Sequence, residues 1–340
     1  MKEFSGYRKG INFGGWFSQC DHSQKRYDYF IRRDDFKRVK RWGFDHVRIP
    51  VDYELVLSED FSYREDGFKR IEDCIVWCRE NGLNMILDLH KTPGFSFDAG
   101  ENEEGFFDSE KYQQIFYDLW AEFAKRFSHH KNLSFELLNE VSEKKYCETW
   151  NRIIRKTIEV IRTYAPEIYI LVGGYHNNSI DAIRDLDPPH DENVVYNFHC
   201  YSPLVFTHQG AYWIPQMKRD FRMPFRCTYE EYDKATQENI YEGYIEHFGE
   251  KAQIIDRAYF TDMFKEAIEI AEKRNVPLYC GEFGVIDLAS PEDTLEWYRC
   301  ICSVFDEYGI GRAMWSYKEM DFGLVDAHYD EIREELLKLV

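Results

Sequence analysis

Eight short apolar runs with helical patterns between them restrict the fold of this chain more than any other feature. The runs are continuously apolar rather than alternating, as expected of strands buried on both faces. They span Gly10–Trp16, His46–Val51, Met85–His90, Leu133–Glu140, Ile168–Gly174, Val194–Tyr201, Pro277–Gly284 and Arg312–Lys318. Helical spacing appears at Asp34–Trp42, Phe68–Glu80, Lys111–Phe127, Cys147–Tyr164 and Ser290–Tyr308. Strand alternating with helix predicts parallel βαβ units.

Eight such units in 340 residues predict an α/β protein with a (β/α)8 TIM-barrel fold, a single catalytic barrel over residues 1–340. A doubly wound open sheet is the competing architecture, but no GxGxxG sequence follows the first run. The interval from Val194 to Pro277 is too long for one βα unit and predicts an insertion over approximately residues 202–260. Because it follows the carboxyl end of the sixth strand, where active sites of barrels lie, we expect it to form a lid or cleft wall.

Polar or aromatic side chains stand at the ends of six predicted strands. In a barrel these ends converge on one mouth, so their side chains are expected to lie close together. One polar residue at a strand end usually only marks the start of a loop. Such residues at six strand ends are difficult to explain by solubility alone. The side chains are Arg48, His90, Asn139 with Glu140, His199 with Tyr201, Glu282, and Trp315.

Two of these residues are glutamates, on strands that lie across the barrel from each other. Cleavage of a glycosidic bond needs one group that protonates the departing oxygen and a second that meets positive charge at the anomeric carbon. Two carboxylates with different pKa values supply both functions. Glu140 and Glu282 are therefore the candidate catalytic pair. The distance between them, which sequence does not give, separates retention from inversion.

At these positions the chain resembles glycoside hydrolase family 5, and the resemblance covers nearly the whole sequence. It implies that Glu140, in the Asn-Glu pair ending strand four, is the acid/base and that Glu282, in Gly-Glu-Phe-Gly, is the nucleophile of a retaining hydrolase. The motifs that match in order are Arg48, His90, Asn139-Glu140, His199-x-Tyr201, Glu282 and Trp315. One departure is Lys91, because many members carry a second histidine there.

The chemistry of the supporting residues agrees with those roles. Arg48 and Tyr201 could hydrogen-bond Glu282 and keep it ionised. Asn139 could hold the sugar 2-hydroxyl, a contact that strengthens toward the transition state. His90 and His199 could bind hydroxyls or orient the acid/base, and Trp315 could form a floor under the sugar.

The opening Gly-Ile-Asn-Phe-Gly-Gly-Trp and the long interval after strand six look most like the clostridial endoglucanase C type of cellulase. This resemblance implies endo-cleavage of β-1,4-glucan, and of mixed-linkage β-1,3-1,4-glucan. A β-mannanase or glucomannanase of the same family is the alternative. Further substrate-site candidates, each of which could instead be scaffold, are Trp16, Tyr175, Asn178, His208 and Trp213.

Charge and cysteine usage limit the partners. A formal charge of −19 argues against nucleic acid and against anionic membranes, and it fits a neutral substrate. The resemblance implies a β-glucan polysaccharide or oligosaccharide as partner, and we expect a monomer. Nine scattered cysteines suggest neither a disulfide framework nor zinc, and no cofactor is expected. Free thiols and the lack of an apolar leader at the start of this chain predict a cytoplasmic protein, or a secreted one if a signal was trimmed.

Three other functions remain open at this stage. His90, Glu140, His199 and Glu282 could ligate a metal in a metal-dependent barrel hydrolase, although the set lacks the carboxylate density of two-metal sites. Lys91 and Lys318 follow strands and could form a Schiff base in a lyase. The same cleft could also bind carbohydrate without turning it over.

Overall fold

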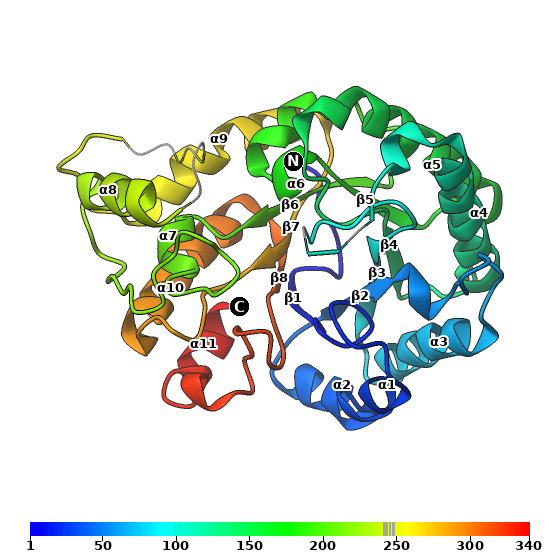
Figure 1. The fold of residues 1–340 in the computed structure, drawn as a ribbon, viewed down its shortest axis with the longest axis horizontal. Helices are drawn as coiled ribbons and strands as arrows, with labels where there is room; N and C mark the ends of the chain where they lie inside the picture. Colours follow the sequence, from blue (N-terminus) through cyan, green and yellow to red (C-terminus); the bar gives the residue numbers. More distant parts are fainter. Residues whose placement is uncertain (99, 102, 241–243, 245, 247–248) are drawn as a thin grey trace.

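The computed structural model describes residues 1–340 except 99, 102, 241–243, 245 and 247–248. Its centre is a closed barrel of parallel strands in the order β1 to β8, which are labelled around the middle of the molecule in Figure 1. This confirms the predicted barrel. The strands are β1 (Lys9–Asn12), β2 (His46–Asp52), β3 (Asn84–Lys91), β4 (Leu133–Glu136), β5 (Tyr169–Gly173), β6 (Val194–Cys200), β7 (Leu278–Phe283) and β8 (Gly311–Met314).

Helices surround the barrel, and five of them match the predicted helical segments closely. The helices are α1 (Gln24–Tyr29), α2 (Arg33–Arg41), α3 (Glu65–Glu80), α4 (Glu110–Phe127), α5 (Cys147–Tyr164), α6 (Tyr175–Asn178), α7 (Leu204–Thr207), α8 (Tyr229–Asn239), α9 (Arg257–Arg274), α10 (Pro291–Tyr308) and α11 (Arg333–Leu339). Between β5 and β6 the chain forms only α6 and the short 3-10 helix η4 (Ile180–Asp185) instead of a long helix. Among the described residues no helix has the length and apolar character needed to cross a bilayer.

Local sequence explains where the helices begin and end. In α10 the Ser290 side chain accepts a hydrogen bond from the Asp293 backbone, and Pro291 occupies the first turn. The helix ends at Gly309, which adopts the left-handed conformation with φ 73°.

The barrel interior is divided into an apolar lower layer and a polar upper layer. Phe4 and Tyr7, stacked with centroids 4.1 Å apart, belong to a buried cluster with Tyr279 of β7 and residues of four other strands. Above it, Arg48 and Glu136 are fully buried inside the barrel. Buried polar and charged side chains destabilise the fold unless they are paired with one another.

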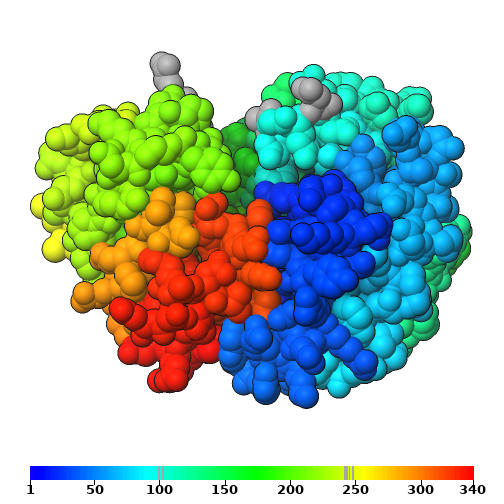
Figure 2. Space-filling view, turned by 60° about the horizontal axis from the view of Figure 1, so that its bottom comes forward, coloured from blue at the N-terminus to red at the C-terminus, as the bar shows by residue number. Residues whose placement is uncertain are grey.

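The segment between β6 and α9 carries α7 and α8 and forms the lobe at the left of Figure 1. Since α9 begins at Arg257, this segment ends slightly before the predicted boundary at residue 260. Part of the predicted insertion, residues 241–243, 245 and 247–248, lies outside the described residues. Figure 2 shows a hollow between the yellow-green surface of this lobe and the cyan surface near residue 100. Both segments follow the carboxyl ends of strands, β6 and β3.

Candidate active site

Glu140 lies just beyond β4, where the backbone leaves the sheet. Strand β4 ends at Glu136, earlier than predicted, but Leu137 and Asn139 still donate backbone hydrogen bonds to Leu171 and Leu89. Glu140 itself has φ 47°, a left-handed conformation that is uncommon for a residue with a side chain. Such strain at a single residue often marks a functional position, because the surrounding structure must enforce it.

The loop after β5 provides part of that enforcement. The backbone N–H groups of His176 and Asn177 donate to the carbonyls of Ser142 and Val141, so the β4 and β5 loops are joined. The Asn177 amide then donates to Glu140 Oε2 at 3.1 Å. The position of the Glu140 carboxyl group is therefore set from a neighbouring strand.

His199 of β6 contacts the other oxygen of the same carboxyl group, with Nδ1 2.7 Å from Glu140 Oε1. The Asn178 amide nitrogen lies 3.5 Å from His199 Nε2 and donates to it, so Nδ1 carries the proton and donates to Glu140. Burial lowers the pKa of His199 to about 4, which keeps the ring neutral near pH 7. Burial also raises the pKa of Glu140, although the Asn177 hydrogen bond opposes that shift.

Glu282 of β7 has different surroundings. Arg48 Nη1 donates to Glu282 Oε1 at 2.8 Å, and the Tyr201 hydroxyl donates to Oε2 at 2.8 Å. His199 Nδ1 lies 3.7 Å from the same Oε2. Two hydrogen bonds, one of them from a cation, stabilise the ionised form of this carboxyl group.

Arg48 joins the site to the polar layer beneath it. Its guanidinium forms a bidentate pair with Glu136, at 2.7 and 2.8 Å, and lies 3.0 Å from Asp88. Nη2 also donates to Asn139 Oδ1 at 2.9 Å. Burial opposes the charge on Arg48, but the carboxylates of Asp88, Glu136 and Glu282 outweigh it and raise the pKa of the guanidinium. Burial raises the pKa of Asp88 to about 7.

One carboxylate oxygen of Glu140, one of Glu282 and a ring nitrogen of His199 all lie within 4.8 Å of one another. The two carboxyl groups thus face a common space from opposite sides of the barrel. One is held by neutral donors and has a raised pKa, whereas the other is held by a cation and a phenol. This pair can divide proton transfer and nucleophilic attack between its members.

His90 and Trp315 form one wall of the space. Their rings are parallel, with centroids 6.1 Å apart. Asp88 fixes His90 through Nδ1 at 2.6 Å, which leaves the buried Nε2 without a hydrogen-bond partner among the described residues. Gly14 lets Trp315 approach β1, because a Cβ at Gly14 would lie 2.6 Å from Trp315 Cη2.

An aromatic row leads from Glu282 out along the insertion. Tyr201 meets His208 edge to face with centroids 5.1 Å apart, and His208 meets Trp213 in the same way at 5.8 Å. Phe322 from the β8 loop lies beside both His208 and Trp213. Trp213 is 41% exposed, so the row ends at the molecular surface.

Three predicted substrate residues make contacts within the protein. Trp16 is 2% exposed, stacks on Phe17 and donates its indole N–H to the Tyr27 carbonyl, so the structure places it in the core. Asn178 is fully buried and holds His199. Tyr175 is buried and its hydroxyl bonds Asp185. All three side chains thus make contacts within the protein, and their role in substrate binding stays a prediction.

Four further residues belong to the site although they were not predicted from the sequence: Asn177, Asp88, Glu136 and Asn12. Asn12 accepts a hydrogen bond from Arg48 Nη1 at 3.0 Å and donates to the Gly281 carbonyl at 2.9 Å. The sequence does contain an indication for Asn12, Asp88 and Glu136, because a polar residue inside an apolar strand is expected to be buried and paired. Asn177 had no comparable signal.

Comparison with known proteins gives a consistent result. A family model described as "Cellulase (glycosyl hydrolase family 5)" matches residues 9–321. Cellodextrinase A of Ruminococcus flavefaciens is 48% identical over 313 residues, covering 92% of this chain and 86% of that protein. Endoglucanase C of Acetivibrio thermocellus is 34% identical over 339 residues, 98% of each. The solved structure of the clostridial cellulose synthase subunit Z from Clostridioides difficile has a TM-score of 0.76 at 27% identity, covering 98% of this chain and 99% of that one.

Proposed function

The chain belongs to glycosyl hydrolase family 5, and from that premise we propose that it cleaves internal β-1,4 bonds of β-glucan by double displacement, with Glu140 and Glu282 as its catalytic residues. The observation that carries the proposal is the pair of carboxyl groups within 4.8 Å in unlike surroundings. The relatives named as an endoglucanase and a cellodextrinase favour β-glucan as the substrate class. Mixed-linkage β-1,3-1,4-glucan is included in the proposal.

In the first step Glu140 protonates the departing glycosidic oxygen while Glu282 attacks the anomeric carbon, giving a glycosyl-enzyme ester. In the second step the ionised Glu140 takes a proton from water, whose oxygen displaces Glu282. Arg48 and Tyr201 support the first step by fixing the position of the Glu282 carboxyl group through hydrogen bonds to both of its oxygens. Burial of Glu140 supports it by raising the pKa of the acid.

The short distance between the two carboxyl groups supports retention. Inverting hydrolases keep their carboxyl groups about 6.5–9.5 Å apart to leave room for a water, whereas retaining ones have about 5–5.5 Å. One oxygen of Glu140 and one of Glu282 lie within 4.8 Å of each other, a short separation that favours the retaining arrangement.

Two buried polar atoms without partners among the described residues support sugar binding. Asn139 donates nothing through Nδ2, because Arg48 engages only its Oδ1. His90 Nε2 is likewise unpaired. An unmet buried donor or acceptor is costly, and sugar hydroxyls, which accept from Asn139 Nδ2 and donate to His90 Nε2, would satisfy both atoms. We assign Asn139 to the 2-hydroxyl, and His90 and Trp315 to the sugar at the cleavage point.

The geometry disfavours the two rival chemistries. Lys91 is ion-paired with Glu54 and Glu101; burial acts against the charge, but these hydrogen bonds raise its pKa, so it is a poor Schiff-base nucleophile. Lys318 donates to the Phe30 carbonyl. A cation between Glu140 and Glu282 would lie close to the Arg48 guanidinium and be repelled by it.

The proposal is tested by one set of digests. The protein is incubated with carboxymethylcellulose, barley β-glucan, laminarin and mannan, and products are followed by chromatography and by NMR of the newly formed anomer. We expect oligosaccharides of intermediate length from the first two substrates, with the β-anomer appearing first. Preferential cleavage of mannan would replace the glucanase assignment by the mannanase alternative, and an initial α-anomer would refute double displacement.

The insertion makes a separate prediction. We expect Trp213→Ala to raise KM for cellohexaose about fivefold or more and to leave kcat nearly unchanged, because loss of a stacking surface worth about 1 kcal/mol affects ground and transition states alike. Tyr164→Ala is the matched control, since Tyr164 is 42% exposed on α5. An unchanged KM in Trp213→Ala, with the control also unchanged, would remove the insertion from the substrate surface.

A further inference from the structure

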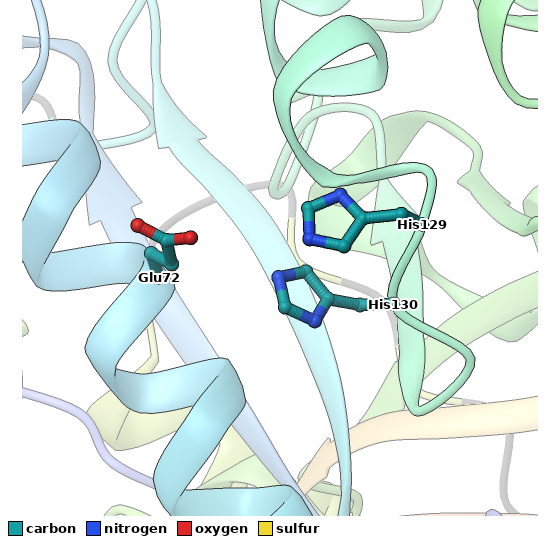
Figure 3. A group of neighbouring side chains, drawn as sticks. All are labelled: Glu72, His129 and His130. Atoms are coloured by element: carbon teal, nitrogen blue, oxygen red, sulfur yellow. The ribbon is translucent and has the colours of Figure 1, made fainter.

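Three potential metal ligands gather where α3 meets the turn between α4 and β4. Glu72 lies on α3, and His129 with His130 lies in the turn that leads to Leu133, the first residue of β4. One ligand atom of each residue lies within 4.8 Å of the other two. Figure 3 shows the Glu72 carboxylate facing the two imidazole rings.

His130 is the unusual member of this group. It is only 7% exposed, and neither Nδ1 nor Nε2 has a hydrogen-bond partner among the described residues. Leaving a buried polar atom unpaired costs about 1–3 kcal/mol. In the described part of the chain no hydrogen bond or ion pair engages the side chain of Glu72 or His129 either. Three groups with unshared electron pairs thus face one another, and the buried one has no hydrogen-bond partner within the described part of the chain.

We propose that Glu72, His129 and His130 form a binding site for a divalent transition-metal cation, with zinc as the best match. Two imidazole nitrogens and one carboxylate oxygen are a common zinc donor set, and a water completes the tetrahedron. Ligands of one zinc at about 2.0–2.2 Å lie about 3.4 Å from each other, so atoms that lie within 4.8 Å must approach by at most about 1.4 Å. His129 is exposed and can rotate to make that adjustment.

Charges around the group are compatible with a cation. Burial lowers the pKa of His130, with His129 and Arg79 acting in the same direction and Glu72 opposing them. The ring is therefore neutral near pH 7, the form that binds metal. Arg79 is the neighbouring positive charge, but it is exposed and its field is screened by solvent and salt.

The position of the site indicates a structural role. The turn enters β4 at the amino-terminal end of the strand, whereas Glu140 follows the carboxyl end. Asn132 already links this turn to α3 by donating to the Ile75 carbonyl at 3.1 Å. A bound cation would add a second link between α3 and the turn, and it would stabilise the folded state without contacting substrate.

The test is zinc binding by the full chain after removal of metals with a chelator. Calorimetric titration with ZnCl2 is compared for the parent, His129→Ala, Glu72→Gln and the exposed control His190→Ala, alongside Tm. We expect one zinc fewer bound by the first two variants, and loss of a Tm increase of about 4 °C at a hundredfold excess over Kd. The control should behave as the parent, and all variants should retain hydrolase activity.

Other groups on the chain could bind zinc, so the ligands must be identified. Two further such groups among the described residues are Glu140 with His199 and Glu282, and His22 with Asp52 and Glu54, and nine free thiols are present. X-ray absorption of the one-zinc complex should show two imidazoles and no sulfur, because each rival group offers one imidazole and the thiols offer sulfur. Sulfur or single-imidazole ligation would overturn the proposal. Unchanged zinc stoichiometry and Tm shift in His129→Ala, an exposed position that cannot disturb the core, would overturn it equally.

Discussion

Replacing Glu282 by Gln is expected to reduce turnover of barley β-glucan by about 10⁴-fold or more, on the scale seen when a covalent nucleophile is removed from an otherwise intact site. The amide keeps the size of the side chain but cannot form the glycosyl ester. Cellotetraose binding should persist, because the contacts proposed for Asn139, His90 and Trp315 remain. Initial rates and calorimetric binding of the same preparation separate these two effects.

The fold should survive this change for an electrostatic reason. Arg48 is fully buried and would lose one of three carboxylate neighbours, but its bidentate pair with Glu136 remains. Circular dichroism and Tm close to the parent values are therefore expected. Glu159→Gln, on the exposed side of α5, is the control for the chemical change itself. A Glu282→Gln protein with parental turnover would exclude Glu282 as nucleophile.

Replacing Glu140 by Gln should have an effect that depends on the leaving group. Loss of a general acid costs about 10²–10⁴-fold, so cellotetraose cleavage should fall by that amount. A dinitrophenyl cellobioside needs no protonation to depart, and formation of the glycosyl-enzyme from it should be nearly unaffected. Pre-steady-state release of dinitrophenol measures that step directly. Equal losses on both substrates would contradict the acid role.

The same variant should change the pH profile. Glu140 acts as acid only while protonated, and burial raises its pKa. In the parent, Glu140 is protonated at pH values below that raised pKa and can act as the acid there. As pH rises through the pKa, kcat/KM should therefore fall. The alkaline limb should vanish in Glu140→Gln. Glu143→Gln, an exposed neighbour three residues further on, should keep the parental profile.

Sequence patterns predicted the barrel well because buried parallel strands have a strong signature. All eight strands lie within or next to the predicted runs, and α5 matches its predicted bounds. Strand β4 is shorter than its apolar run, since the chain continues extended through Leu137 to Asn139 and then turns sharply at Glu140. A hydrophobic pattern does not reveal where pairing with the neighbouring strand stops.

The site was only partly predictable, for two physical reasons. Trp16 occurs in a glycine-rich segment at a strand end, which favours a substrate contact, yet packing against Phe17 and a bond to Tyr27 bury it. Asn177 reaches Glu140 through a backbone with φ 57°, between His176 and Asn178 with similarly positive angles. Asn and His adopt left-handed angles more readily than most residues, but the sequence does not say that three in a row do so or that Asn177 then contacts Glu140.

The joining of the β4 and β5 loops has a consequence for how such an enzyme can diversify. The side chain that adjusts proton affinity at Glu140, Asn177, is exposed and belongs to a different loop from the groups that hold Glu282. Arg48 and Tyr201, in contrast, are tied into the barrel. Substitutions in the β5 loop can therefore change the pKa of Glu140, and with it the pH range of activity, without altering the residues that hold Glu282. The pH range and the reaction itself can thus evolve independently.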